Sequence, residues 1–274
     1  MKIGVRAHDF GKQDVETLAS TIKEAGFKCV QLAPTKAIKG IDGFIGISRE
    51  HLAEIKEAFT KNDVELTVWG CYIEPSIPDG EERRANVEIF KQNLEHAKAL
   101  GIGIVGTETT HMSIFSTPAE RDKAYLRLKD SVLRMVEHAE KIGGVSVGIE
   151  PVAEHTLNTP ELAHKLVEDI NSKHLSIIFD PVNLILPLTV RRQREIFDEL
   201  FRYVGNKISV VHVKDMIVSN GEKNWCNIST GIIDYPHIME QLFRIKPHIR
   251  LLREGVTMDS HQFDLIAMER LLRK

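Results

Sequence analysis

The sequence predicts an α/β protein whose eight parallel strands close into a (β/α)8 barrel. Apolar, strand-like segments alternate along the chain with amphipathic helices, a pattern that favours parallel pairing of the strands. Eight such units fit within 274 residues, a typical length for one closed barrel. No Pro-, Gly- or Ser-rich linker interrupts them, so we expect residues 1–274 to form a single domain. The alternative, an open doubly wound sheet, usually has a glycine-rich phosphate loop after its first strand, whereas here the first turn reads H-D-F-G-K.

Each predicted strand is a short, mainly apolar run that ends at a polar residue, a glycine or a proline. In Ser176–Asn183, for example, three large apolar residues run into Asp180 and Pro181, and a proline cannot continue the hydrogen-bonded ladder, so Asp180 is expected at the strand end. The predicted strands, in order, are Ile3–Ala7, Phe27–Leu32, Val64–Cys71, Ile102–Thr107, Val145–Ile149, the first part of Ser176–Asn183, Ile208–Val213 and Ile249–Leu252.

The predicted helices carry apolar residues at helical spacing and several begin or end at recognisable signals. Thr117 followed by Pro118 reads as an N-cap with proline at the first helical position, and Gly26 and Gly101 read as C-terminal stops. The helices, in order, are Asp14–Ala25, Ser48–Asn62, Glu81–Leu100, Thr117–Ile142, Thr159–Ile170, Val190–Val204, Pro236–Ile245 and Phe263–Leu272.

Composition excludes several classes of partner. A net charge of −3 and a pI near 6.5 give no basic footprint for nucleic acid. The apolar runs are too short to span a membrane, and neither a secretory signal nor a lipidation motif is recognisable, so we expect a cytoplasmic protein with no membrane partner. The three cysteines are widely spaced without a CxxC, which argues against a disulfide framework and against a cysteine-based zinc site.

Four successive late strands each deliver a polar residue at the carboxyl end: Glu150, Asp180, His212 and Glu254. Because the carboxyl ends of barrel strands meet at one mouth, these side chains are expected to converge there. Taken singly, Asp180 could cap a turn and His212 could be a core histidine. Three ionised carboxylates this close together would repel one another unless a bound cation neutralised their charge. Three carboxylates and one imidazole suit one divalent metal ion: Mn²⁺, Mg²⁺, Co²⁺ or Zn²⁺.

The motifs around these residues carry a family resemblance. G-I-E-P-V, F-D-P-V-N, V-H-V-K-D and L-R-E-G-V resemble the strand ends of the xylose isomerase-like TIM barrel superfamily, in its sugar phosphate isomerase/epimerase group. The resemblance implies that Glu150, Asp180, His212 and Glu254 are the metal ligands. It further implies, from the ketose 3-epimerase branch, that Glu150 and Glu254 are the catalytic acid and base. Barrels of this group are often dimers or tetramers, so a homo-oligomer is an open expectation.

The expected function is that of a metal-dependent isomerase or epimerase acting on a small carbohydrate: a sugar, sugar acid or cyclitol. Proton transfer would pass through a metal-stabilised enediolate. The alternative is a lyase or dehydratase, of inosose dehydratase or C-glycoside-cleaving type, which would begin with the same proton abstraction. An endonuclease IV-like hydrolase is disfavoured, because Asn183 stands where a zinc-binding histidine would be needed and the chain lacks a basic surface.

Five further residues are predicted to bind substrate. His8 and Trp69 lie near the ends of the first and third strands, and Glu108 follows the fourth. Asn183 replaces a histidine that the epimerase branch commonly places there, and an amide can bind a hydroxyl but cannot carry charge. Lys214 lies on the same side of its strand as His212 by alternation, where it could contact a carboxylate or a phosphate. The branch also usually supplies an arginine from this loop, which is missing here before Ile217.

Overall fold

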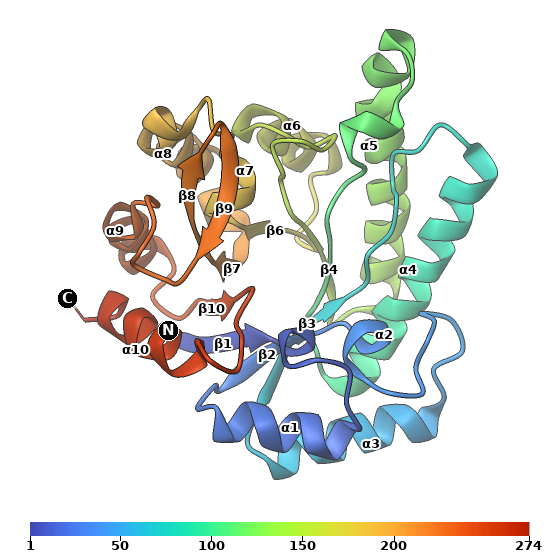
Figure 1. The fold of residues 1–274 in the computed structure, drawn as a ribbon. Coiled ribbons are helices and arrows are strands. Elements are labelled where there is room, and N and C mark those ends of the chain that lie inside the picture. Colours follow the sequence, from blue (N-terminus) through green and yellow to red (C-terminus); the bar gives the residue numbers. More distant parts are fainter. Residues whose placement is uncertain (274) are drawn as a thin grey trace.

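The computed structural model, which describes residues 1–273, confirms the closed eight-stranded parallel barrel (Figure 1). Neighbouring strands follow chain order around the barrel, and β1 pairs with β10 to close it. The barrel strands are β1 (Lys2–Arg6), β2 (Cys29–Leu32), β3 (Glu65–Gly70), β4 (Ile104–Thr107), β5 (Ser146–Ile149), β6 (Leu175–Phe179), β7 (Ile208–Val213) and β10 (Arg250–Arg253). All eight predicted strands are therefore present, with small differences at their ends.

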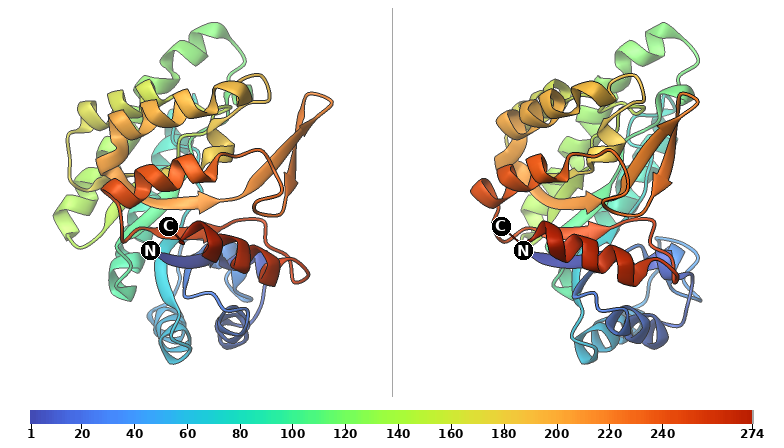
Figure 2. Two further views of the ribbon diagram at one scale, coloured as in Figure 1. Left: turned by 90° about the vertical axis from the view of Figure 1, so that its left-hand side faces the viewer. Right: turned by 60° about the vertical axis from the view of Figure 1, so that its left-hand side comes forward.

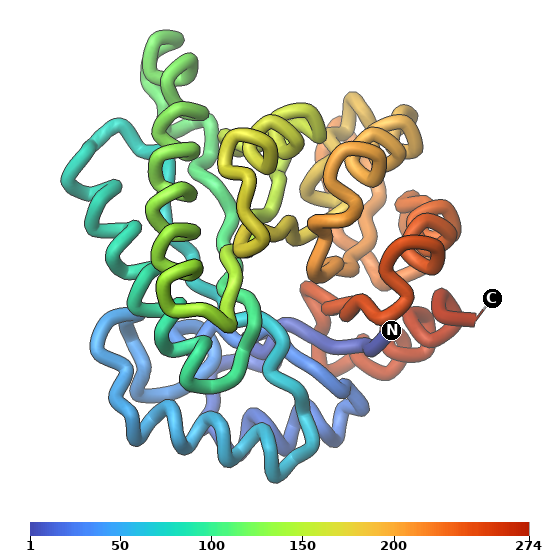
Figure 3. The backbone as a smooth tube through the Cα atoms, turned by 180° about the vertical axis from the view of Figure 1, so that it is seen from behind, coloured from blue at the N-terminus to red at the C-terminus, as the bar shows by residue number. Residues whose placement is uncertain are grey.

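Helices surround the barrel, as the view from behind shows (Figure 3). The Thr117 signal is confirmed as a capping box with Glu120, and Gly101 ends its helix with φ of 77°. The long helices are α1 (Val15–Glu24), α3 (Arg49–Lys61), α4 (Gly80–Leu100), α5 (Pro118–Ile142), α6 (Pro160–Ile170), α8 (Gln193–Val204), α9 (Tyr235–Ile245) and α10 (His261–Leu271). Short turns of helix are η1 (Ala7–Phe10), α2 (Pro34–Ala37), η2 (Met112–Ile114), α7 (Pro181–Leu184), η3 (Val190–Arg192) and η4 (Gly205–Lys207). None of the helices within residues 1–273 is long and apolar enough to cross a membrane.

One element was not predicted. After β7, the chain forms an antiparallel hairpin of β8 (Asp215–Ser219) and β9 (Glu222–Cys226), a two-stranded sheet separate from the barrel. It extends outward from the barrel, as Figure 2 shows. Its turn is Asn220-Gly221, and both residues have positive φ (54° and 79°), as the tight hairpin turn requires.

The interior of the barrel is filled by side chains. Two strand glycines leave the room that this packing needs, since a Cβ on Gly106 would lie 2.7 Å from Ile178 Cδ1 and one on Gly148 would lie 2.9 Å from Ile104 Cγ2. The buried residues of this inner cluster are Cys29, Val68, Ile178, Val210 and Leu252. A packed interior leaves the mouth, where the strands end, as the place for a ligand.

Candidate metal centre

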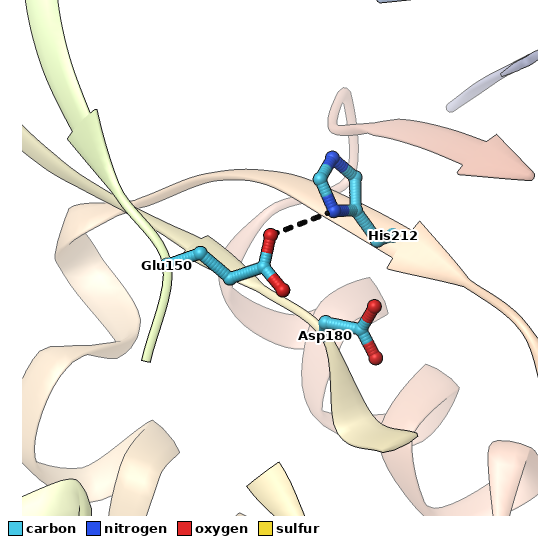
Figure 4. Close-up of side chains that lie close together, drawn as sticks. All are labelled: Glu150, Asp180 and His212. Atoms are coloured by element: carbon cyan, nitrogen blue, oxygen red, sulfur yellow. Dashed lines mark ion pairs between the residues drawn. The ribbon is translucent and has the colours of Figure 1, made fainter. Parts of the chain in front are cut away.

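The four predicted ligands meet at the mouth of the barrel. Glu150 follows β5, Asp180 follows β6, His212 lies near the end of β7 and Glu254 follows β10. All four are buried, with at most 5% of any of them exposed. Glu150, Asp180 and His212 each offer one ligand atom within 4.8 Å of the others, and Figure 4 shows the three side chains close together, with Glu150 directed toward His212. Glu254 adjoins this group, because its Oε1 lies 3.1 Å from His212 Nδ1.

The donor set fits a divalent cation. His212 Nδ1 lies 3.0 Å from Glu150 Oε2, so two acidic side chains face one imidazole nitrogen. Among the described residues, His212 Nδ1 and Asp180 Oδ2 make no hydrogen bond of acceptable geometry, and their near neighbours are the charged groups of Glu150, Glu254 and Lys214. Buried polar atoms are almost always satisfied, and convergent carboxylate and imidazole atoms are typical metal ligands. The residues that would hold the ion are therefore Glu150, Asp180, His212 and Glu254.

The two carboxylate oxygens of Asp180 have different roles: Oδ1 caps a helix and Oδ2 faces the cluster. Its Oδ1 accepts the backbone N–H groups of Val182 and Asn183, both at 2.9 Å, and so caps α7. Pro181 occupies the first position of that short helix, where no N–H is needed. The cap holds the side chain in one orientation and leaves Oδ2 turned toward the centre. The turn-capping interpretation and the metal interpretation of Asp180 are thus compatible.

Gln31, which the sequence did not single out, orients His212. Its Oε1 lies 2.8 Å from His212 Nε2, and its own amide donates to the Tyr72 hydroxyl at 3.0 Å. An amide oxygen only accepts hydrogen bonds, so Nε2 carries a proton, and once the ring is neutral its Nδ1 lone pair faces the centre. This contact selects the tautomer that can bind a metal.

Replacing Gln31 with leucine is therefore expected to weaken metal binding by about 10–100-fold. Direct titration of the metal-free protein with Zn²⁺ or Mn²⁺ would measure the change. Asn93→Leu is the matched control, because Asn93 is also a buried amide, and it accepts a ring N–H from Trp69 at 2.7 Å, away from the centre. Equal metal affinity in the Gln31 variant and the wild type would contradict this role.

Lys214 lies within the acidic cluster. Its ammonium is 2.9 Å from Asp180 Oδ2 and 3.0 Å from Glu254 Oε2, and its side chain is 13% exposed. Burial alone would lower the pKa of Lys214, but Asp180 and Glu254 raise it above its ordinary value. The lysine is therefore a permanent positive charge beside two of the predicted ligands.

The remaining ionisable groups respond strongly to one another. Burial would lower the pKa of His212, but Glu254 and Glu150 raise it to about 9. Burial opposes ionisation of Glu254, yet His212, Lys214 and Arg6 hold its pKa well below its usual range. Burial raises the pKa of Asp180 to about 6 although Lys214 opposes the shift. A bound metal ion requires a neutral His212, so metal binding below about pH 9 would release a proton.

Besides Lys214, three more of the predicted substrate contacts lie close to the cluster: Asn183, Glu108 and His8. Asn183 donates its side-chain N–H to Glu150 Oε1 at 2.6 Å. Burial, together with Glu150 and Glu254, raises the pKa of Glu108 to about 7. Burial and the positive charge of Arg6 lower the pKa of His8 to about 3, so its imidazole is neutral at pH 7.

The position of Trp69 does not fit its predicted role as a substrate contact. The side chain is fully buried, and its Nε1 donates to Asn93 of α4, so the ring packs between β3 and that helix. Its strand neighbour Val68 belongs to the inner cluster, and alternation directs Trp69 to the opposite face. Trp69 therefore supports the packing of α4 and does not reach the metal centre.

The architecture defines a class of protein: a parallel α/β barrel with a cluster of potential metal ligands at the carboxyl ends of its strands. The chain belongs to the xylose isomerase-like TIM barrel family, whose family model matches residues 19–255. A search of curated protein sequences found no match.

Several solved structures share the fold along nearly the whole chain. A D-tagatose 3-epimerase-like protein has a TM-score of 0.80 at 20% identity, covering 99% of this chain and 97% of the other. The IolI protein with a bound zinc atom has a TM-score of 0.78 at 15% identity, with 99% and 98% covered. The 3-keto-D-glucoside 4-epimerase YcjR from E. coli has a TM-score of 0.75 at 20% identity, with 99% and 98% covered. At these identities the likeness establishes the fold.

Proposed function

We propose that the chain is a divalent-metal-dependent isomerase or epimerase of a small carbohydrate. The observation that carries the proposal is the buried cluster in which two acidic side chains, Glu150 and Glu254, face the same nitrogen of His212 at 3.0 and 3.1 Å. The sugar epimerases among the structural neighbours, and the zinc bound by IolI, support the same assignment.

The proposed chemistry assigns a role to each side chain. Asp180 and His212 act as metal ligands, and Glu150 and Glu254 act as ligands that also carry a proton. A divalent cation bound there supplies a Lewis acid, which makes the hydrogen beside a sugar carbonyl more acidic. One of the two glutamates removes that proton and the other returns a proton. A glutamate can take the first proton only while it is ionised, and the neighbours of Glu254 keep it ionised at neutral pH.

Polar residues around the pair would position the substrate. Asn183 holds Glu150 by the hydrogen bond described above, and its amide can also face a substrate hydroxyl. Glu108, whose pKa near 7 allows it to donate or accept, suits a contact with a sugar hydroxyl. Lys214 suits an oxygen that carries negative charge, and His8 suits a neutral hydrogen-bonding partner.

Solvent hydrogen exchange tests the proposal. The metal-loaded protein is incubated in D₂O with a panel of ketoses, sugar acids and inosose-like compounds, and products are followed by NMR and mass spectrometry. We expect one deuterium to enter at a carbon beside the carbonyl, without loss of water, and we expect chelator-treated protein to give none. Elimination of water or of an aglycone would instead identify the lyase. Exchange that persists unchanged after removal of the metal would contradict the proposal.

A further inference from the structure

A cavity lies beside the metal centre. It has a volume of about 410 Å³ and lies between the end of β7, the β8–β9 hairpin and the loop after β10. Lys214 and Glu254 line it, whereas Glu150, Asp180 and His212 do not. This side pocket therefore opens from the Glu254 edge of the centre. Its volume falls within the range of small-molecule sites.

Arg6 is a rigidly held cation in the lining of the side pocket. Its Nε and Nη2 donate to Asp9 Oδ1 at 2.9 and 2.8 Å, and Asp9 Oδ2 accepts the backbone N–H groups of Gly255 and Val256. Its Nη1 lies 3.4 Å from Glu254 Oε2, and its side chain is 27% exposed. A guanidinium fixed on one edge and accessible on the other is suited to bind a carboxylate or a phosphate.

The lining of the side pocket contains three cations and two carboxylates. Arg253 also lines the side pocket, and its Nε donates a hydrogen bond to Asp264 Oδ2 at 2.9 Å. Lys214 is the third cation of the lining. The acidic partners of the two arginines, Asp9 and Asp264, are not part of the lining.

The two carboxylates in the lining have partners of their own. Asp215 accepts four backbone N–H groups, from Met216, Ser229, Gly231 and Ile233, at 2.9–3.2 Å. Glu254 is occupied by His212 and Lys214. Arg6 is the most accessible of the three cations, with 27% of its side chain exposed against 13% for Lys214 and 3% for Arg253, so an anionic ligand group is favoured beside Arg6.

The hairpin adds an aromatic wall. Trp225 of β9 lines the side pocket and is 61% exposed, with the Lys214 ammonium 5.2 Å from its ring centroid. An exposed indole beside a cationic cavity can pack against the C–H face of a ligand while its neighbours bind the polar groups.

We propose that the side pocket binds an anionic group, a carboxylate or a phosphate, on the part of the substrate remote from the reacting carbon. Arg6 is the principal recognition residue, Lys214 assists it, and Trp225 covers the carbon chain. The substrate class is then a sugar acid or a sugar phosphate, not a neutral sugar. This inference depends on the proposed function in one respect: the carbon that reacts is taken to lie at the metal centre.

Calorimetric binding to the full, metal-loaded chain tests the inference with three probes: D-fructose, D-gluconate and D-fructose 6-phosphate at constant ionic strength. We expect at least one anionic probe to bind about tenfold or more tightly than D-fructose. The anionic probe with the greater gain identifies the group that the pocket takes. Arg6→Gln, measured at saturating metal because Arg6 also lies 3.4 Å from Glu254, is expected to abolish the preference and to weaken D-fructose binding by a smaller factor than the anionic probe. Arg192→Gln, at an exposed helix arginine paired with Glu195, is the matched control and should keep the preference.

Equal binding of all three probes would overturn the inference. So would an Arg6→Gln variant that weakens D-fructose and the anions by the same factor, because Arg6 would then act only by positioning Glu254. Trp225→Ala is a second test, at a residue that is not a predicted metal ligand. This variant should bind the anionic probe more weakly while its metal content stays unchanged. Hydrogen exchange distinguishes failure of this inference from failure of the proposed function. If the protein exchanges a neutral sugar and shows no preference for anions, only the anion-binding side pocket is contradicted. If anions bind through Arg6 and no hydrogen is exchanged, only the proposed isomerase or epimerase activity is contradicted.

Discussion

Replacing Asp180 with asparagine is expected to weaken metal binding by more than about 100-fold while the fold is preserved. The expected loss exceeds the 10–100-fold typical of residues that only orient a ligand, because Asp180 would contact the ion itself. Asparagine retains the Oδ1 acceptor that caps α7 through Val182 and Asn183, and it replaces the carboxylate oxygen Oδ2 with a neutral NH₂. Metal content after dialysis and titration with Zn²⁺ or Mn²⁺ would measure the effect, and hydrogen exchange into the sugar should fall with it.

The chain offers a close control for this change. Asp79 caps α4 in the same way, since its Oδ1 accepts the backbone N–H groups of Glu81 and Glu82 at 2.8 and 2.9 Å. Asp79→Asn makes the same chemical change at the same kind of cap, at an exposed position, and should leave metal affinity unaltered. If Asp180→Asn bound metal as tightly as wild type, Asp180 would be a cap only.

The fold was predictable because its evidence is local and repeated. Each strand–helix unit shows its own apolar run, its own stop signal and its own helical stripe, so errors at single boundaries do not change the architecture. The cluster was predictable for a related reason, because topology places the carboxyl ends of parallel strands at one mouth. Asp180 and His212 could therefore be brought together from sequence positions alone.

Contacts across the barrel were not predictable in this way. Gln31 meets His212 although 181 positions separate them, and the pairing depends on side-chain directions within the closed barrel. Trp69 was misplaced because β3 is apolar on both faces, so alternation along the strand gives no sign of which face is inward. The position of Arg6 depends on Asp9 and on the backbone after β10, at the opposite end of the chain.

The hairpin is a different case, since its signal was present in the sequence. Asn220-Gly221 is the dipeptide most typical of a two-residue hairpin turn, and β-forming residues such as Ile217, Val218 and Trp225 lie on either side of it. The segment follows a barrel strand where a helix is expected, which masked the turn. Recognising it would have placed Trp225 near the mouth.

Replacing Lys214 with methionine is expected to destabilise the protein far more without metal than with it. In the metal-free protein the ammonium is the cation that pairs with both Asp180 and Glu254, and both carboxylates are buried. Removing one partner of a buried ion pair typically costs about 3–5 kcal/mol of unfolding free energy. A divalent ion held by the same carboxylates should restore most of that loss, so bound metal should stabilise the variant more than the wild type.

Denaturant unfolding with a chelator and with saturating metal would measure both quantities. Lys207→Met is the control, because Lys207 is a partly buried lysine whose ammonium donates to the Ser172 carbonyl at 2.7 Å and not to a carboxylate. In the metal-free variant the deficit should be larger at pH 8 than at pH 5. Burial already raises the pKa of Asp180 to about 6, so this carboxyl can take up a proton as the pH falls and no longer needs a counter-charge. If Lys214→Met lowers the unfolding free energy equally with and without metal, Lys214 stabilises the fold by packing. If bound metal reduces that loss, the lysine and the metal ion neutralise the same two carboxylates.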